Sequence, residues 1–135
     1  MYNHLRLNPL TVKKYLFMVK EISDLERLKH ISEATGKIIK FSENKTENDF
    51  LNDEMLNSSV LYQFIIIGEA IRHVSPGLLT AYDYPWHLPK SFRNYIAHEY
   101  FGINLKQVYK TVTDLMPGFK ELIDKMIEEM LKVEG

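Results

Sequence analysis

The chain has 135 residues, of which 45% are hydrophobic and 26% are charged, the usual balance of one globular domain. It has no cysteine, which excludes disulfides and zinc–thiolate sites and favours a reducing compartment, the cytoplasm. The formal net charge of −1 argues against a surface that coats nucleic acid over its whole extent. We therefore predict a single cytoplasmic domain over residues 1–135 without a membrane partner, because the most apolar stretch, residues 64–68, is too short to span a bilayer.

Apolar residues recur at intervals of three and four, so the sequence predicts a nearly all-α protein. Thr11 is the expected N-cap of a first helix that continues to about Gly36. The apolar stripe of this helix comprises Val12, Tyr15, Leu16, Val19, Ile22, Leu25, Leu28 and Ile31. Residues 41–48 are polar and predict a loop.

A short helix at residues 49–51 and a long helix from about Asp53 to His73 are expected next. Residues 60–67 are apolar on nearly every side, which predicts that the long helix is central and the most buried. Ser75-Pro76-Gly77 predicts a short turn with proline at the first position of a helix. Residues 84–89 predict an irregular connector.

Lys90 or Ser91 is expected to open the following helix, and Gly102 to end it. Asn104 is the expected N-cap of the last helical stretch, which Pro117-Gly118 should kink or break into residues 105–116 and 119–133. Together these elements predict an antiparallel up-down bundle of four or five helices.

The segment from Arg93 to Tyr100 holds the side chains that phosphodiester cleavage needs in the absence of a metal. Arginine keeps its charge and forks onto phosphate oxygens, and histidine exchanges a proton near pH 7. In RNA the 2′-hydroxyl can attack the neighbouring phosphate, so Arg93 could stabilise the phosphorane while His98 moves a proton. An arginine and a histidine at this spacing are more often an exposed cation and a helix-end histidine, so the pair alone is weak evidence.

The spacing within this segment has a geometric consequence. On an ideal helix His98 lies about 140° around the axis from Arg93, whereas Tyr100 lies within roughly 20° of it. Either the helix ends near His98, or a second copy of the chain completes the site. In a two-fold dimer, two such pairs would meet, and one His98 could act as base while the other acts as acid.

Several segments closely resemble the HepT-like family of the HEPN superfamily, in that family's order and at about its spacing. They are Ile66-Ile67-Gly68-Glu69-Ala70-Ile71-Arg72, Ser75-Pro76, Tyr84-Pro85-Trp86 and Arg93-Asn94-Tyr95-Ile96-Ala97-His98-Glu99-Tyr100-Phe101-Gly102-Ile103-Asn104-Leu105. The resemblance covers roughly residues 60–116. It implies a helical bundle that forms a homodimer through the helices carrying the motif. It also implies the toxin half of a toxin–antitoxin pair, whose antitoxin is a minimal nucleotidyltransferase.

The resemblance implies roles only for the positions that match. Arg93 and His98 correspond to the catalytic pair of a metal-independent endoribonuclease, with RNA as substrate and no cofactor. Tyr100 corresponds to the tyrosine onto which the partner transferase places AMP. From the residues alone, Tyr100 is equally an aromatic side chain at a dimer seam.

Three further residues are expected to support the site: Glu69, Asn94 and Glu99. Gly68 beside the first of them is expected to allow close approach of two helices. Glu69 and His73 lie four residues apart and could ligate a metal, but no third ligand is evident, so a polar pair on one helix face is the expectation. Tyr62 stands where many family members have a basic residue, which leaves one phosphate contact open.

Two rival hypotheses come from other functional classes. The first is a non-catalytic helical subunit that docks a nucleotidyltransferase and presents or accepts a nucleotide. The second is a dimerisation domain whose motif only holds helices together.

Overall fold

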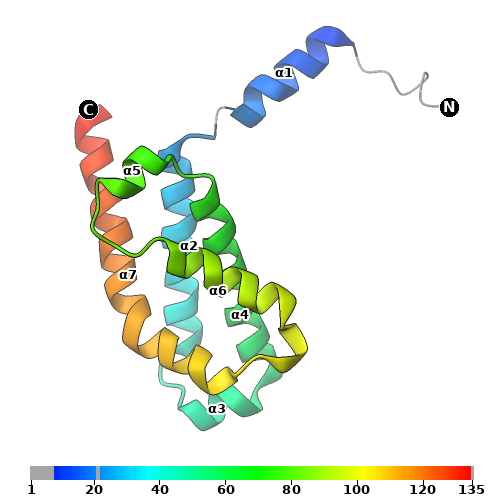
Figure 1. Ribbon diagram of the computed structural model, residues 1–135, viewed down its shortest axis with the longest axis vertical. Helices are drawn as coiled ribbons and strands as arrows, with labels where there is room; N and C mark the ends of the chain where they lie inside the picture. Colours follow the sequence, from blue (N-terminus) through cyan, green and yellow to red (C-terminus); the bar gives the residue numbers. More distant parts are fainter. Residues whose placement is uncertain (1–7, 21, 135) are drawn as a thin grey trace, which may run out of the picture.

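The computed structural model describes residues 8–20 and 22–134, and all the regular elements in these ranges are helical (Figure 1). In chain order they are α1 (Pro9–Lys20), α2 (Asp24–Ser42), α3 (Glu47–Asn52), α4 (Glu54–Arg72), α5 (Pro76–Thr80), α6 (His87–His98), the 3₁₀ turn η2 (Tyr100–Gly102) and α7 (Leu105–Glu134). The predicted all-α helical bundle is therefore confirmed. None of the helices in the described ranges is long and apolar enough to cross a membrane.

Helices α2 and α4 form the centre of the bundle. They run antiparallel, joined by α3 at one end, and α7 packs along α2 while α6 crosses α4 (Figure 1). The most deeply buried side chains come from all of these helices: Leu28, Ile31, Ile38, Phe50, Val60, Ile71, Ile96, Val108, Ile123 and Met126. The predicted burial of α4 is confirmed on the faces toward α2 and α6, but Tyr62 within its apolar run is exposed.

The first predicted helix is wrong in two respects. It is two helices, because the side chain of Ser23 accepts a hydrogen bond from the Glu26 amide and starts α2 there. In addition, α2 runs past Gly36 to Ser42, so the loop is residues 43–46 rather than 41–48. Thr11 lies inside α1, and the Asn8 side chain accepts from the Leu10 amide instead. The side chains of residues 15–20, part of the predicted stripe, lie outside what the structure describes.

The next three helices follow the local sequence closely. Thr46 and Asp49 form a reciprocal capping box at the start of α3. Asp53 caps α4 by accepting from the Leu56 amide. Pro76 occupies the first turn of α5, as predicted. The short helix, the long helix and the proline turn are thus confirmed.

Helix α6 begins at His87, before the predicted start at Lys90 or Ser91. Pro89 is tolerated because the amides of a first helical turn have no intrahelical partner. The helix ends at His98, and Gly102 does not end it but closes η2 without a positive φ. The tryptophan before α6 is buried: Trp86 Nε1 donates to the Leu79 carbonyl at 2.7 Å, and its ring packs against Tyr84 and Phe119.

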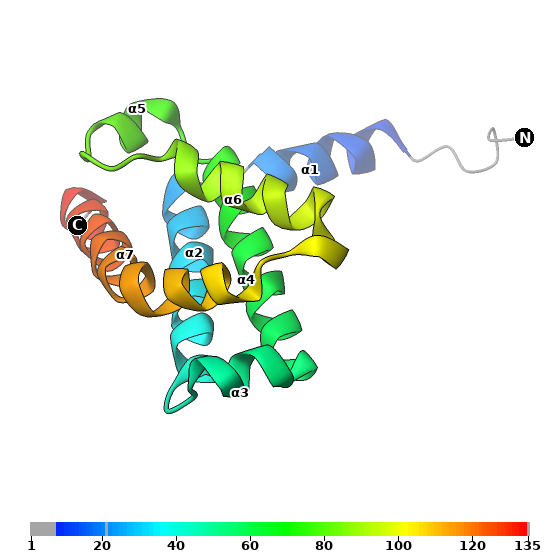
Figure 2. The same cartoon turned by 60° about the horizontal axis from the view of Figure 1, so that its bottom comes forward.

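Helix α7 begins as predicted, with the Asn104 side chain accepting from the Gln107 amide at 3.2 Å. The predicted break at Pro117-Gly118 is wrong, since α7 is one helix with Pro117 inside it. Figure 2 shows that the ribbon changes direction along this helix, which accords with the predicted kink.

Candidate active site on helices α4 and α6

The site depends on a close approach between α4 and α6 at Gly68. A Cβ atom at this position would overlap the Cβ of Arg93, lie 2.8 Å from its Cγ and lie 3.0 Å from the Pro89 carbonyl oxygen. Only glycine leaves the space that α6 occupies here. The prediction that Gly68 allows close helix approach is confirmed, and the approach sets the next residue, Glu69, against Arg93.

Arg93 is held by polar partners on both helices. Its Nη2 lies 2.7 Å from Glu69 Oε1, and its Nη1 donates to Asn94 Oδ1 at 3.2 Å. The Nε atom is buried and has no hydrogen-bond partner among the described residues. The side chain is 25% exposed, so the guanidinium is fixed in place with a limited opening to solvent.

A second arginine joins the same carboxylate. Arg72, the last residue of α4, places Nη1 3.5 Å from Glu69 Oε1, and its side chain is 57% exposed. Glu69 therefore pairs with two arginines, and the pair expected with His73 is not among its contacts in the described part of the chain. His73 caps α4 with its backbone amide, which donates to the Ala70 and Ile71 carbonyls.

His98 lies at the exposed carboxyl end of α6. Of the two geometric alternatives, the structure has the helix end at this residue. The backbone then turns through η2, because the Glu99 amide donates to the Tyr95 carbonyl and the Gly102 amide to the Glu99 carbonyl. The hydrogen bonds of Arg93 described above go to Glu69 and Asn94, so Arg93 and His98 are not directly bonded to each other within the described part of the chain.

Tyr100 and Glu99 follow His98 on the same exposed surface. The Tyr100 side chain is 47% exposed, and its ring meets the fully exposed ring of Phe101 edge to face at 5.7 Å. The site residues thus form two groups. Glu69, Arg93 and Asn94 lie at the helix crossing, and His98, Glu99 and Tyr100 lie at the end of α6.

Sequence reasoning missed the residue that fixes this end. The Tyr95 hydroxyl accepts a hydrogen bond from the Asn104 amide at 2.9 Å, which ties α6 to the start of α7 across the η2 turn. Its position inside the Arg93–Tyr100 segment is the only sequence feature that could have pointed to it.

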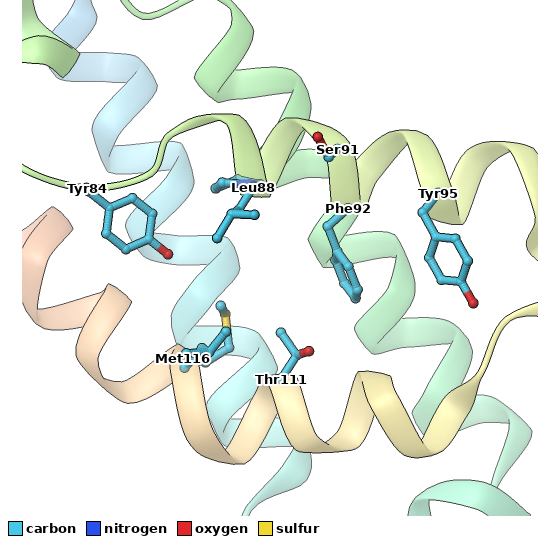
Figure 3. Close-up of a pocket in the computed structure, with 9 residues that line it drawn as sticks. Tyr84, Leu88, Ser91, Phe92, Tyr95, Thr111 and Met116 are labelled. Carbon is cyan, nitrogen blue, oxygen red and sulfur yellow. The ribbon is translucent and has the colours of Figure 1, made fainter.

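The face of α6 that carries Phe92 and Tyr95 borders a pocket of about 330 Å³ against α7 (Figure 3). Its lining is mainly apolar: Tyr84, Leu88, Pro89, Ser91, Phe92, Tyr95, Thr111, Leu115 and Met116. Phe92 and Tyr95 point from α6 toward α7 in Figure 3. Burial raises the pKa of the Tyr84 hydroxyl, so this phenol stays protonated at neutral pH.

A family model described as "Ribonuclease HepT-like" matches residues 31–126. The chain belongs to this family. The match starts in α2, earlier than the segments that carry the sequence resemblance, and it includes every candidate site residue of this HepT-like chain. No solved structure gives a significant match.

Relatives of this HepT-like chain carry ribonuclease names. "Putative RNase MJ1380" of Methanocaldococcus jannaschii is 30% identical over 70% of this chain and 87% of its own length. "Probable ribonuclease HepT" of Thermococcus cleftensis is 29% identical over 77% of this chain and 96% of its own length. "Gamma-glutamylcyclotransferase and putative RNase MJ0434" of M. jannaschii is 33% identical over 78% of this chain, which spans only 48% of that protein.

Proposed function

We propose that this chain is a metal-independent endoribonuclease and the toxin of a toxin–antitoxin pair, acting as a homodimer. The observation that carries the proposal is the combination at α6 of a fixed, partly exposed Arg93 with an exposed His98 at the end of the same helix. Family membership and the ribonuclease names of the relatives support RNA as the substrate.

In the proposed mechanism, the imidazole of one His98 takes the proton of the 2′-hydroxyl, whose oxygen attacks the adjacent phosphorus. The bond to the 5′-oxygen breaks, and this oxygen takes a proton from the protonated His98 of the second copy. The product strand then ends in a 2′,3′-cyclic phosphate. The free donors of Arg93 face the non-bridging oxygens, where negative charge develops in the transition state.

The arrangement of the site residues as two groups in one chain supports a composite site at a dimer interface. Arg93 contacts Glu69 and Asn94, while His98 is exposed at the end of α6. A two-fold axis near the end of α6 would bring two such ends together, because an isologous contact repeats the same patch on both copies. Glu69 and Asn94 then orient Arg93, and Glu99 borders the cleft.

Tyr100 is the proposed switch of this enzyme. Its exposed phenol, two residues after His98, is open to a partner nucleotidyltransferase that transfers AMP to it. The added adenosine and phosphodiester charge would fill the space that a substrate phosphate needs. Incubation with the partner and ATP should add the mass of one or more AMP units and abolish cleavage. Tyr100→Phe should gain no mass and remain active. If AMP is found on that variant, the modified residue is not Tyr100.

One observation favours a different function, a non-catalytic subunit that binds a nucleotidyltransferase. Within the described residues the charge of Arg93 is matched by Glu69, and no hydrogen bond or ion pair joins His98 to Arg93. Such a subunit would form the complex and accept or present a nucleotide without cleaving RNA.

Cleavage of a mixed RNA pool by purified protein in EDTA separates the two functions. We expect the wild type to cleave the RNA and His98→Ala to leave it intact. His30→Ala replaces an exposed histidine on α2, serves as the control and should cleave like the wild type. Loss of one proton-transfer group should slow the reaction about 10²–10⁴-fold. If folded wild-type protein without AMP on Tyr100 leaves the RNA intact, the binding-subunit function replaces the enzyme.

A further inference from the structure

We propose that Arg72 is a second phosphate-binding residue, which holds the RNA phosphate next to the one that is cleaved. This inference rests on the proposed ribonuclease function. It starts from the cluster of Arg72, Glu69 and Arg93, in which two guanidinium groups share one carboxylate oxygen. Such a cluster carries a net charge of one positive unit beside the proposed site.

The contacts with Glu69 limit the distance between the two cations. Arg72 Nη1 and Arg93 Nη2 lie 3.5 Å and 2.7 Å from Glu69 Oε1, so the two nitrogens cannot be further apart than the sum of these distances. Consecutive phosphates of a single strand are separated by a comparable span. This limit is compatible with one strand that has a phosphate on Arg93 and the neighbouring phosphate on Arg72.

The donors of Arg72 remain available for this contact. A guanidinium has five N–H groups, and the contact with Glu69 at 3.5 Å uses one of them at the limit of hydrogen-bond length. The side chain is 57% exposed, compared with 25% for Arg93. An exposed pair between neighbouring turns of a helix contributes little to stability, so the pair with Glu69 alone does not explain this arrangement.

Glu69 has a defined part in this subsite. Its carboxylate oxygen contacts both arginines, holds them close to each other and offsets one of their two charges. The remaining positive charge favours the polyanionic strand, although the chain as a whole has a net charge of −1. The attraction of RNA is therefore local to the carboxyl end of α4 and the adjacent face of α6.

The first test measures the affinity for an RNA that carries a 2′-O-methyl group at the mapped cleavage position, at several salt concentrations. Arg72→Ala should raise Kd roughly tenfold and lower the slope of log Kd against log salt by about 0.7, the value for one lost phosphate contact on a single strand. Arg72→Lys should restore most of the slope. Lys132→Ala removes an exposed charge at the end of α7 that is paired with a carboxylate at the same distance of 3.5 Å, and should change neither quantity.

A second test locates the contact on the RNA. A neutral methylphosphonate is placed at the phosphate on either side of the cleaved one. At one of these two positions it should weaken binding by the wild type but not by Arg72→Ala, because the contact is already lost in that variant. With unmodified RNA, Arg72→Ala should raise KM and leave kcat unchanged.

Each alternative outcome overturns the inference. If the wild type cleaves RNA and Arg72→Ala keeps the wild-type Kd and salt slope, Arg72 is only a surface ion-pair partner. If kcat falls while KM is unchanged, Arg72 acts through Glu69 on Arg93 instead. If the wild type neither binds nor cleaves RNA, the ribonuclease function fails and this inference with it.

Discussion

Replacement of Gly68 by alanine tests how the crossing of α4 and α6 builds the site. The new Cβ would overlap the Cβ of Arg93, an atom fixed to the α6 backbone, so the helices must separate. Overpacking of this kind costs about 1–3 kcal/mol, and the overlap with a rigid atom favours the upper end. Alanine regains about 1 kcal/mol of helix propensity, which leaves a net destabilisation of about 2 kcal/mol.

Gly118→Ala is a matched control for this variant. Gly118 also lies inside a helix, but a Cβ there meets no atom within 4 Å. We expect this variant to be about 1 kcal/mol more stable than the wild type, because only the propensity term applies. The same chemical change thus has opposite signs at the two positions.

Urea unfolding followed by circular dichroism measures the difference. With m of about 1–3 kcal/mol per molar urea, the midpoint of Gly68→Ala should fall by roughly 1 M and that of Gly118→Ala should rise. All proteins are compared at one concentration, because the stability of the proposed dimer would depend on it. Gly68→Ala should also lose ribonuclease activity, since Arg93 moves with α6. If both alanine variants are stabilised alike, the close approach at Gly68 has no energetic role.

Two further predictions concern single hydrogen-bonded groups. Tyr95→Phe removes the acceptor of the Asn104 amide and should lower the free energy of unfolding, measured in urea, by about 1 kcal/mol. Tyr62→Phe is the control at an exposed site on α4 and should leave this free energy unchanged. Equal stability of the two variants would show that the hydrogen bond to Tyr95 does not contribute to stability. For Asp124, burial raises the pKa, but the hydrogen bonds from Lys120 and Ser32 and the charge of Lys120 outweigh it, so the folded pKa lies below the ordinary 3.8. Its contribution to stability is present above pH 3.8 and is lost as the pH falls through the folded pKa. The stability difference between wild type and Asp124→Asn should therefore shrink in acid unfolding below that pH, and a constant difference would argue against a lowered pKa.

Elements defined by local chemistry could be predicted from the sequence. Asp53 and Asn104 cap their helices through side chains that accept from amides three residues further along the chain. Pro76 opens α5 for the same local reason. The start of α2 was missed because the apolar stripe continues across Ser23, which conceals the interruption of the helix. The start of α6 is not predicted correctly, because Pro89 is also typical of a connector. The first turn of a helix tolerates proline, and Pro89 lies in the first turn of α6.

The site shows the limit of sequence reasoning more clearly. Arg93 and Glu69 are 24 positions apart on different helices, and no periodicity predicts that their side chains meet. The chemistry of the segment from Arg93 to Tyr100 indicates Arg93, the resemblance indicates Glu69, and Gly68 explains their contact. The hydrogen bond from the Asn104 amide to the Tyr95 hydroxyl depends on the backbone path through η2. The sequence predicts a continuous helix up to Gly102 instead, so it does not predict this path.

The buried Trp86 makes the movements of α6 visible by spectroscopy. It is the only tryptophan in the sequence and immediately precedes α6, with its ring against Phe119 of α7. A shift of α6 would expose this ring to water and move its fluorescence emission to longer wavelength. The chain therefore carries an intrinsic optical reporter next to the helix that bears Arg93 and His98, and a shift of that helix can be followed without a label.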